Sequence, residues 1–115
     1  MKATNKGFRN FTVDRVKVPK KCKSRPDNFK SYVWETQDGR LVAIKEFNDW
    51  HLINTFNMLV NARNYAKKMS VHKALTHYAQ QIERHCAYHL SYIGHEVYLR
   101  HYAAEIAEGT KKLPE

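Results

Sequence analysis

The sequence predicts an α+β fold: a small antiparallel sheet, made of a β-hairpin plus an N-terminal strand, followed by two or three α-helices. Asp38-Gly39 separates two runs of aromatic and β-branched residues. This dipeptide favours a tight hairpin turn because glycine tolerates a positive φ. Asn48 and Asp49 stand where a helix needs its N-cap. The chain that follows shows helical apolar periodicity.

The length of 115 residues, with 43% apolar residues, predicts one domain with a modest core over 1–115. The change of pattern along the chain divides this domain into four parts. We expect a basic N-terminal strand and loop over 1–30, the β-hairpin over 31–47, the helical part over 49–109 and a frayed tail over 110–115.

The predicted sheet has three segments. Apolar and polar residues alternate from Phe11 to Val18, which is typical of a strand, and Pro19 ends this segment. The hairpin arms are expected over 31–36 and 41–47. Pairing of the first segment with the hairpin would give a three-stranded antiparallel sheet, which is about the minimum for independent stability.

The helical part has two apolar stripes and a final segment. The helical i, i+3, i+4, i+7 spacing of the first helix runs through Leu52, Ile53, Phe56, Leu59, Val60 and Arg63, and Lys67-Lys68 mark its expected end. Ser70 is the expected N-cap of the second helix, whose stripe is Val71, Leu75, Tyr78, Ala79, Ile82, Cys86 and Leu90. Gly94 is expected to break or kink it. A last segment carries Val97, Tyr98, Tyr102 and Ile106, and Gly109 is its natural C′ residue.

The positive charge is concentrated at the N-terminus. Residues 1–30 carry a net +8, residues 31–49 carry −2 and residues 50–115 carry +3, within a total of +9. Such a segment attracts anions: nucleic acid, phosphorylated ligands or an acidic protein surface. A solvated tail that only aids solubility is the alternative. No apolar run is long enough for a membrane span, and Cys22 and Cys86 suggest no disulfide framework, so we expect a reducing cytoplasm.

Catalytic and metal motifs are weak. His85 and His89 are four residues apart on one predicted helix, a spacing that can place two imidazoles on a metal. The glutamate of a helical metalloprotease motif is missing, however, and Cys86 between them falls on the apolar stripe, where a buried thiol is favoured. No glycine-rich phosphate loop is present. We therefore expect no enzyme, no cofactor and no metal site.

The basic loop is the better binding candidate. Its cations lie close in sequence to Phe29, Tyr32 and Trp34, and charge on phosphate with rings on bases is how nucleotides and single strands are commonly held. Arginine adds a planar fork for phosphate. The residues predicted to bind a ligand or its phosphate are Lys20, Lys21, Lys23, Arg25, Trp34, His51, Asn54, Arg63 and Arg100.

A family resemblance rests on the hairpin and the helix start. Trp34-x-Thr-x-Asp-Gly39, then Ile44-Lys-Glu-Phe47 and His51-Leu-Ile-Asn54, resembles a pattern in small phage-encoded accessory proteins, with Phe47 where that pattern has Met. A short sheet followed by two long helices is similar to the Thoeris anti-defence sponges, which are oligomers that sequester cyclic nucleotide signals. The resemblance implies a phage accessory protein that acts inside a bacterial cell.

Under this resemblance His51 and Asn54 matter because they lie on the first helical turn, where free backbone N–H groups attract an anion. The alternative is that both residues only brace the junction between sheet and helix. A surplus of tyrosine on the later helices is typical of an oligomer interface, so we expect a homo-oligomer; tyrosines at the rim of the core are the alternative.

The resulting hypothesis is a non-enzymatic anti-defence protein that sequesters an anionic, cyclic nucleotide in the bacterial host cytoplasm. Two alternatives stay open. One is a direct protein inhibitor of a host defence effector, of the anti-CRISPR kind, and the other is a general nucleic-acid-binding protein. No membrane partner is expected.

Overall fold

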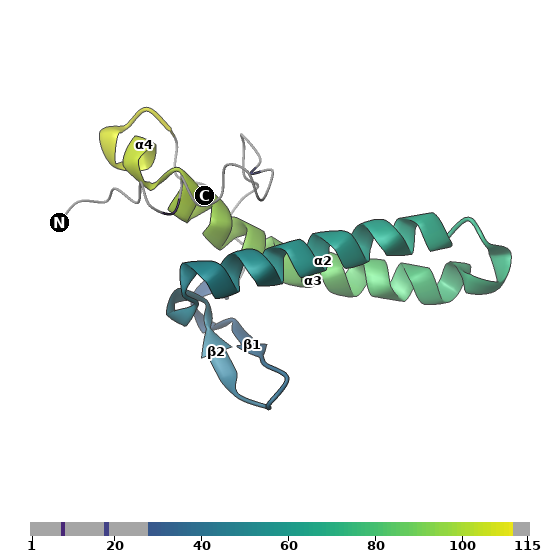
Figure 1. Ribbon diagram of the computed structural model, residues 1–115. Helices are drawn as coiled ribbons and strands as arrows, with labels where there is room; N and C mark the ends of the chain where they lie inside the picture. Colours follow the sequence, from purple (N-terminus) through teal and green to yellow (C-terminus); the bar gives the residue numbers. More distant parts are fainter. Residues whose placement is uncertain (1–7, 9–17, 19–27, 112–115) are drawn as a thin grey trace.

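The structure is a computed structural model that describes Phe8, Val18 and residues 28–111. In this part of the chain, a two-stranded antiparallel hairpin leads into two long helices that lie side by side and a short third helix (Figure 1). The predicted α+β class is confirmed. The predicted N-terminal strand lies outside the described residues except for Val18, which is not in a strand.

The hairpin consists of β1 (Val33–Glu35) and β2 (Leu41–Ala43), with Trp34 opposite Val42 in the antiparallel register. Gly39 has a φ of +86° in the connecting turn, and its N–H donates to the carbonyl of Thr36 over 3.0 Å. A positive φ is the conformation for which glycine is favoured. The predicted hairpin and its Asp38-Gly39 turn are therefore confirmed.

Both strands are shorter than the predicted arms. Ile44 turns inward after β2 to begin the 3₁₀ helix η2 (Ile44–Glu46), where its side chain is buried. The Glu46 carboxylate accepts the N–H of Ala43 over 3.0 Å and so closes this turn. At the other end, Ser31 belongs to the 3₁₀ helix η1 (Phe29–Ser31) and not to a strand. Extending the arms over 31–36 and 41–47 was wrong, because burial of Ile44 and of Phe29 bends the chain toward the helices.

Helix α2 (Asp49–Met69) begins where the sequence predicts it. The Asn48 side-chain oxygen accepts the N–H of His51 over 2.7 Å, which satisfies one of the free donors of the first turn. Lys67 and Lys68 lie in the last turn, where cations complement the helix dipole. Both predicted ends of this helix are confirmed.

The start of the second long helix was predicted wrongly. Ser70 is the C-cap of α2, and its hydroxyl donates to the carbonyl of Lys67 over 2.7 Å. A 3₁₀ turn, η3 (Lys73–Leu75), follows before α3 (Thr76–His101) begins. The Thr76 hydroxyl donates to the Ser70 carbonyl over 2.8 Å and fixes this connection. Three members of the predicted stripe are therefore exposed: Val71, Leu75 and Tyr78.

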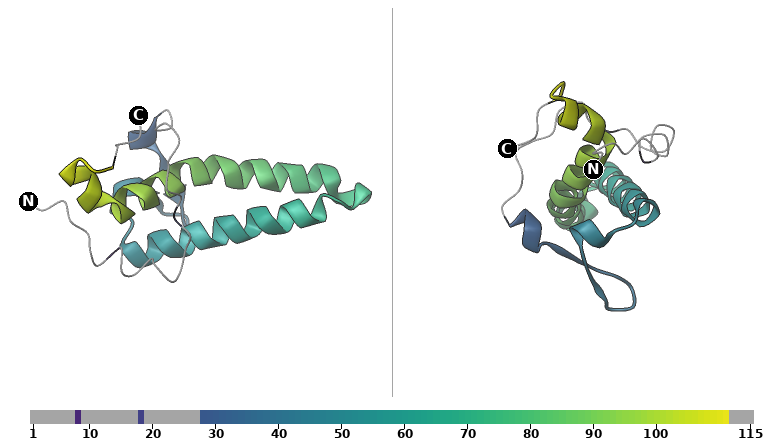
Figure 2. Two further views of the ribbon diagram at one scale, coloured as in Figure 1. Left: turned by 90° about the horizontal axis from the view of Figure 1, so that it is seen from above. Right: turned by 90° about the vertical axis from the view of Figure 1, so that its left-hand side faces the viewer.

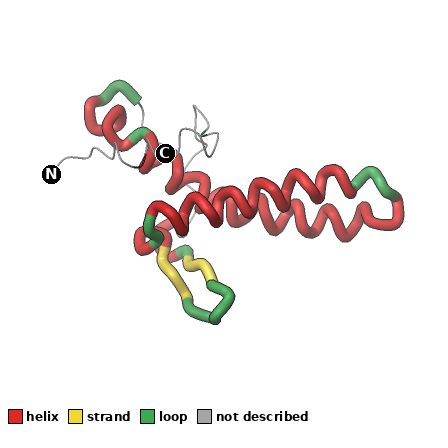
Figure 3. The backbone as a smooth tube through the Cα atoms, viewed as in Figure 1, coloured by secondary structure: helices red, strands yellow, loops and turns green. Residues whose placement is uncertain are grey.

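Helix α3 runs through Gly94 without a break (Figure 3). A Cβ at this position would lie 3.5 Å from Phe56 Cε1, which is ordinary van der Waals contact, so nothing in the geometry requires glycine there. Of the two predicted outcomes, a break or a kink, the break is wrong, because packing of α3 along α2 outweighs the weak helix propensity of one glycine. A short helix, α4 (Ala103–Glu108), follows, and Gly109 ends it with a φ of +80°, as predicted.

The core lies between α2 and α3 at the end where the hairpin joins them (Figure 2). Leu52 and Ile53 from α2 and Ile93 and Val97 from α3 are 0–1% exposed. The hairpin side of this core is covered by aromatic residues. Phe29, Tyr32 and Phe47 are buried there, and Trp34 packs against them half-buried. The hairpin is thus held against α3 by rings, which sets up the site described next.

Candidate functional site

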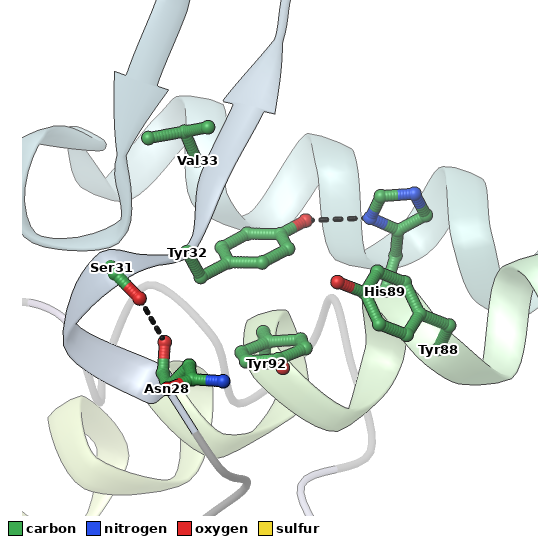
Figure 4. A pocket seen from close by; sticks show the side chains of 7 residues that line it. All are labelled: Asn28, Ser31, Tyr32, Val33, Tyr88, His89 and Tyr92. Atoms are coloured by element: carbon green, nitrogen blue, oxygen red, sulfur yellow. Dashed lines mark hydrogen bonds between the residues drawn. The ribbon is translucent and has the colours of Figure 1, made fainter.

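A pocket with a volume of about 290 Å³ lies where the chain entering β1 meets α3 (Figure 4). It is lined by Asn28, Ser31, Tyr32, Val33, Tyr88, His89 and Tyr92. One wall comes from η1 and the start of β1, and the other from two successive turns of α3. The lining therefore combines flat rings with phenol, imidazole, hydroxyl and amide groups.

Ring stacking joins the two walls. The rings of Tyr32 and Tyr92 stack with centroids 4.3 Å apart and an angle of 11° between their planes. Tyr88 meets Tyr92 edge to face at 5.3 Å and is 56% exposed, so its ring forms the open side of the pocket. Offset stacking and edge-to-face contacts are the favoured geometries of aromatic pairs. Tyr88 and Tyr92 can meet in this way because they are four residues apart on α3 and therefore lie on the same helix face.

One hydrogen bond crosses the pocket. The Tyr32 hydroxyl lies 2.7 Å from Nδ1 of His89, and the phenol donates when that nitrogen carries no proton. Burial, followed by the neighbouring Tyr88 and Tyr92, raises the pKa of Tyr32 above its usual value. Tyr32 therefore keeps its proton at any physiological pH.

His89 is the titratable centre of the site. Burial, followed by the neighbouring His85, lowers the pKa of His89 below its ordinary value. The rings of His85 and His89 lie 4.6 Å apart, and Trp34 from β1 meets His89 edge-on at 5.0 Å. These surroundings favour the neutral imidazole. Its Nε2 makes no hydrogen bond within the described part of the chain.

We expect the protein to lose stability as the pH falls below about 6.5, the ordinary value for histidine, because the unfolded chain then binds a proton at His89 before the folded protein does. The loss continues until the pH reaches the lowered pKa of the folded state. The free energy of unfolding, measured by urea denaturation across this range, should fall more steeply for the wild type than for His89→Asn. An equal decrease with pH for the wild type and for His89→Asn would contradict the lowered pKa of His89.

The predicted ligand residues are scattered. Lys20, Lys21, Lys23 and Arg25 lie outside the described residues. Trp34 is half-buried, with its ring against His89, next to the pocket but not among its lining residues.

His51 and Asn54 lie on the first turns of α2, away from the pocket. The backbone N–H of His51 is occupied by the Asn48 cap, and its ring stacks on buried Phe47 with centroids 4.5 Å apart. Asn54 is exposed on the same helix. The contacts of His51 are those that brace the junction between hairpin and helix.

The two predicted arginines lie in structural surroundings. Arg63 faces Cys86 across the helix pair, and its Nε is buried without a hydrogen bond to the described residues. Arg100 donates to the carboxylates of Glu96 and Asp49 over 2.8 and 2.9 Å, and its side chain is 13% exposed. The structure brings neither arginine to the pocket.

The histidine pair and Cys86 were the weak candidates for metal chemistry. Within the described residues, no group of three or more His, Cys, Asp or Glu side chains is placed to hold a metal ion. Cys86 is buried, as the apolar stripe predicts, and burial raises the pKa of its thiol although Arg63 lowers it. A raised pKa makes the reactive thiolate scarce at neutral pH.

Some pocket residues were missed by the sequence reasoning. Asn28 has a φ of +60°, and its backbone carbonyl accepts both the N–H and the hydroxyl of Ser31. Asparagine adopts this left-handed conformation more readily than most residues, so Pro26-Asp-Asn28 was the available signal for a turn. The sequence analysis considered His89 only as one of a histidine pair, and Tyr88 and Tyr92 only as part of the tyrosine surplus on the later helices. Their contacts with Tyr32 join residues far apart in the sequence, which helical periodicity cannot predict.

The fold and the site together define a small α+β protein in which a helical pair and a docked hairpin form an aromatic–histidine pocket. No protein-family model, curated protein or solved structure matched this chain. Among the helices of the described residues, none has the length and apolar character needed to cross a membrane.

Proposed function

We propose that the protein is a non-catalytic binder of a nucleotide, with the base on the aromatic pocket and the phosphates on the basic segment that precedes it. The observation that carries this proposal is the position of the pocket. Its first wall begins at Asn28, directly after the segment that holds most of the net charge. Arg25 precedes Asn28 by three positions in the sequence.

The pocket has the chemistry for a base. Tyr88 presents an exposed ring beside the Tyr32–Tyr92 stack, and stacking on aromatic rings is tolerant of base identity. Asn28 and His89 are both lining residues, so an amide and an imidazole border the pocket as well (Figure 4). Neutral His89 and protonated Tyr32 are suited to binding and do not include an activated nucleophile.

Sequestration is the role that we propose for such binding. A non-catalytic binder lowers the free concentration of its ligand, and the resemblance to phage accessory proteins makes a host defence signal, a cyclic nucleotide, the proposed ligand. The proposed place of action is the bacterial host cytoplasm. Inhibition of a host effector by direct contact remains the alternative that rests on the resemblance alone.

A second candidate function is binding of single-stranded nucleic acid. Tyr78, Gln81, His85 and Tyr88 are all exposed and follow one another at intervals of three or four residues on α3, which places them on one helix face that leads to the pocket. A row of this kind can stack several successive bases, whereas a mononucleotide needs the pocket alone.

Titration calorimetry with cyclic AMP, cyclic di-AMP and a short single-stranded oligonucleotide tests both functions. Tyr88→Ala should weaken binding by about 5- to 150-fold, because stacking on one ring contributes about 1–3 kcal/mol. Tyr78→Ala is the matched control: it should leave nucleotide binding unchanged but weaken binding of the oligonucleotide. A steep loss of affinity with salt would favour the nucleic acid. Failure of all three probes to bind, or equal affinity of Tyr88→Ala, would overturn the pocket as a base-binding site.

A further inference from the structure

The outer face of α2 carries an uncharged, partly aromatic row of exposed side chains. Trp50, Met58 and Tyr65 are 60%, 51% and 65% exposed, and Asn54 and Asn61 are exposed between them. At about 100° per residue these five positions fall within an arc of roughly 80° on the helix. We call this row the α2 stripe; its members are Trp50, Asn54, Met58, Asn61 and Tyr65.

The residue types of the α2 stripe are arranged symmetrically about its centre. An aromatic residue stands at each end, Asn54 follows Trp50 by four positions, and Asn61 precedes Tyr65 by four. Asn57 and Met58 form the centre. A two-fold axis through this centre pairs Trp50 of one copy with Tyr65 of the other, and Asn54 with Asn61. Such self-complementary patches are what an isologous interface between identical subunits requires.

The chemistry of the α2 stripe fits a second copy of itself. Each asparagine amide is both donor and acceptor, so two amides can satisfy each other across the axis. Aromatic residues and methionine are enriched at protein interfaces, and charged residues are depleted in their centres. The flanks are complementary in charge, because exposed Glu46 precedes the stripe and exposed Lys68 follows it. An antiparallel arrangement brings the end of α2 that carries Lys68 toward the end of the other copy that Glu46 precedes.

We propose that a second copy of this chain packs antiparallel against the α2 stripe, about a two-fold axis at Asn57 and Met58. The proposal goes beyond ligand binding and is independent of it, since no α2 residue lines the pocket. In the end-on view of Figure 2, η1 and α2 lie on opposite sides of α3, so the pocket and the proposed interface use separate surfaces. A dimer would then hold two pockets.

Charge substitution at the centre tests this proposal, with mass measured by sedimentation or native mass spectrometry over a concentration series. The wild type should be a dimer. Met58→Lys and Met58→Glu should each weaken dimerisation at least about tenfold, because the axis brings like charges together. An equimolar mixture of the two variants should restore the dimer. Val71→Lys, at an exposed position off the stripe, is the matched control and should remain dimeric.

Both Met58 variants should keep the helical circular dichroism of the wild type, since the side chain is half exposed. A monomeric wild type, or a Met58→Lys protein that dimerises as well as the wild type, would overturn the proposal. Separate variants that fail to recover in the mixture would contradict the two-fold placement. Nucleotide titration of the same samples is read independently, so the two proposals succeed or fail separately.

Discussion

Arg100→Met is expected to lower the free energy of unfolding by about 3–5 kcal/mol, because it removes the closest charged partner of the buried Glu96 carboxylate. Glu96 is 3% exposed on α3, and Arg100 binds it one helical turn later with an Nε–Oε2 distance of 2.8 Å. The other cation near this carboxylate, Lys45, lies at 3.2 Å but is 68% exposed. Without the guanidinium, the buried Glu96 carboxylate keeps only this exposed lysine as a charged partner among the described residues.

Arg100 also connects elements that are distant in sequence. Its guanidinium contacts Asp49 at the start of α2 and lies 3.5 Å from the carbonyl of Ile44 in η2. Equilibrium urea denaturation measures the effect. Arg40→Met is the matched control, because its ion pair with Asp38 is mostly exposed and such pairs contribute about 0.2–1 kcal/mol.

The double variant Glu96→Met/Arg100→Met is expected to be more stable than Arg100→Met alone, since it also removes the buried Glu96 carboxylate that has lost its arginine partner. A loss for Arg100→Met no larger than that for Arg40→Met would show that the network does not stabilise the fold. The same measurement separates a structural role of Arg100 from ligand binding, because nucleotide affinity of the folded variant should be unchanged.

Phe29→Ala is expected to destabilise the protein by about 3–5 kcal/mol, the range for removal of a buried aromatic side chain. Phe29 is 5% exposed, and its ring lies 4.7 Å from that of His95 and 6.5 Å from that of Tyr92. It therefore attaches η1 to α3, directly beside the pocket. The loss should appear both in urea denaturation and in the near-ultraviolet dichroism of the packed tyrosines.

Leu41→Ala is the control for this variant, because Leu41 is 64% exposed in β2 and a surface substitution of this kind changes stability by about 0.5 kcal/mol or less. The two variants should also differ in ligand binding, since only Phe29 supports a pocket wall. If Phe29→Ala lost no more stability than Leu41→Ala, the docking of η1 would contribute little to the fold.

Much of the local structure could be predicted from particular residues. Asp38-Gly39 identified the hairpin turn, Asn48 the start of α2, and Gly109 the end of α4. These signals work because a positive φ or a free backbone donor restricts which residue can stand there. The burial of Leu52, Ile53, Phe56 and Leu59 followed equally from helical spacing.

Other residues were compatible with two different local structures or roles, and only the packing of the helices decided between them. Ser70 can cap the start or the end of a helix, and its hydroxyl turns back to Lys67 because the chain needs a further 3₁₀ turn to lay α3 along α2. Gly94 can interrupt a helix, but α3 continues through this position while it packs against α2. Arg100 can bind phosphate, and the fold places it instead against Glu96 and Asp49.

The sequence by itself therefore determined that a hairpin precedes the helices, the turn at Asp38-Gly39, the caps at Asn48 and Gly109, and the concentration of positive charge before Asn28. Those properties depend on neighbouring residues and on composition. Only the tertiary structure decided that Tyr32 meets His89, which is 57 residues away in the sequence, and Tyr92, and that the α2 stripe stays outside the core. Contacts of this range depend on how two helices and a hairpin pack together, which no local pattern encodes.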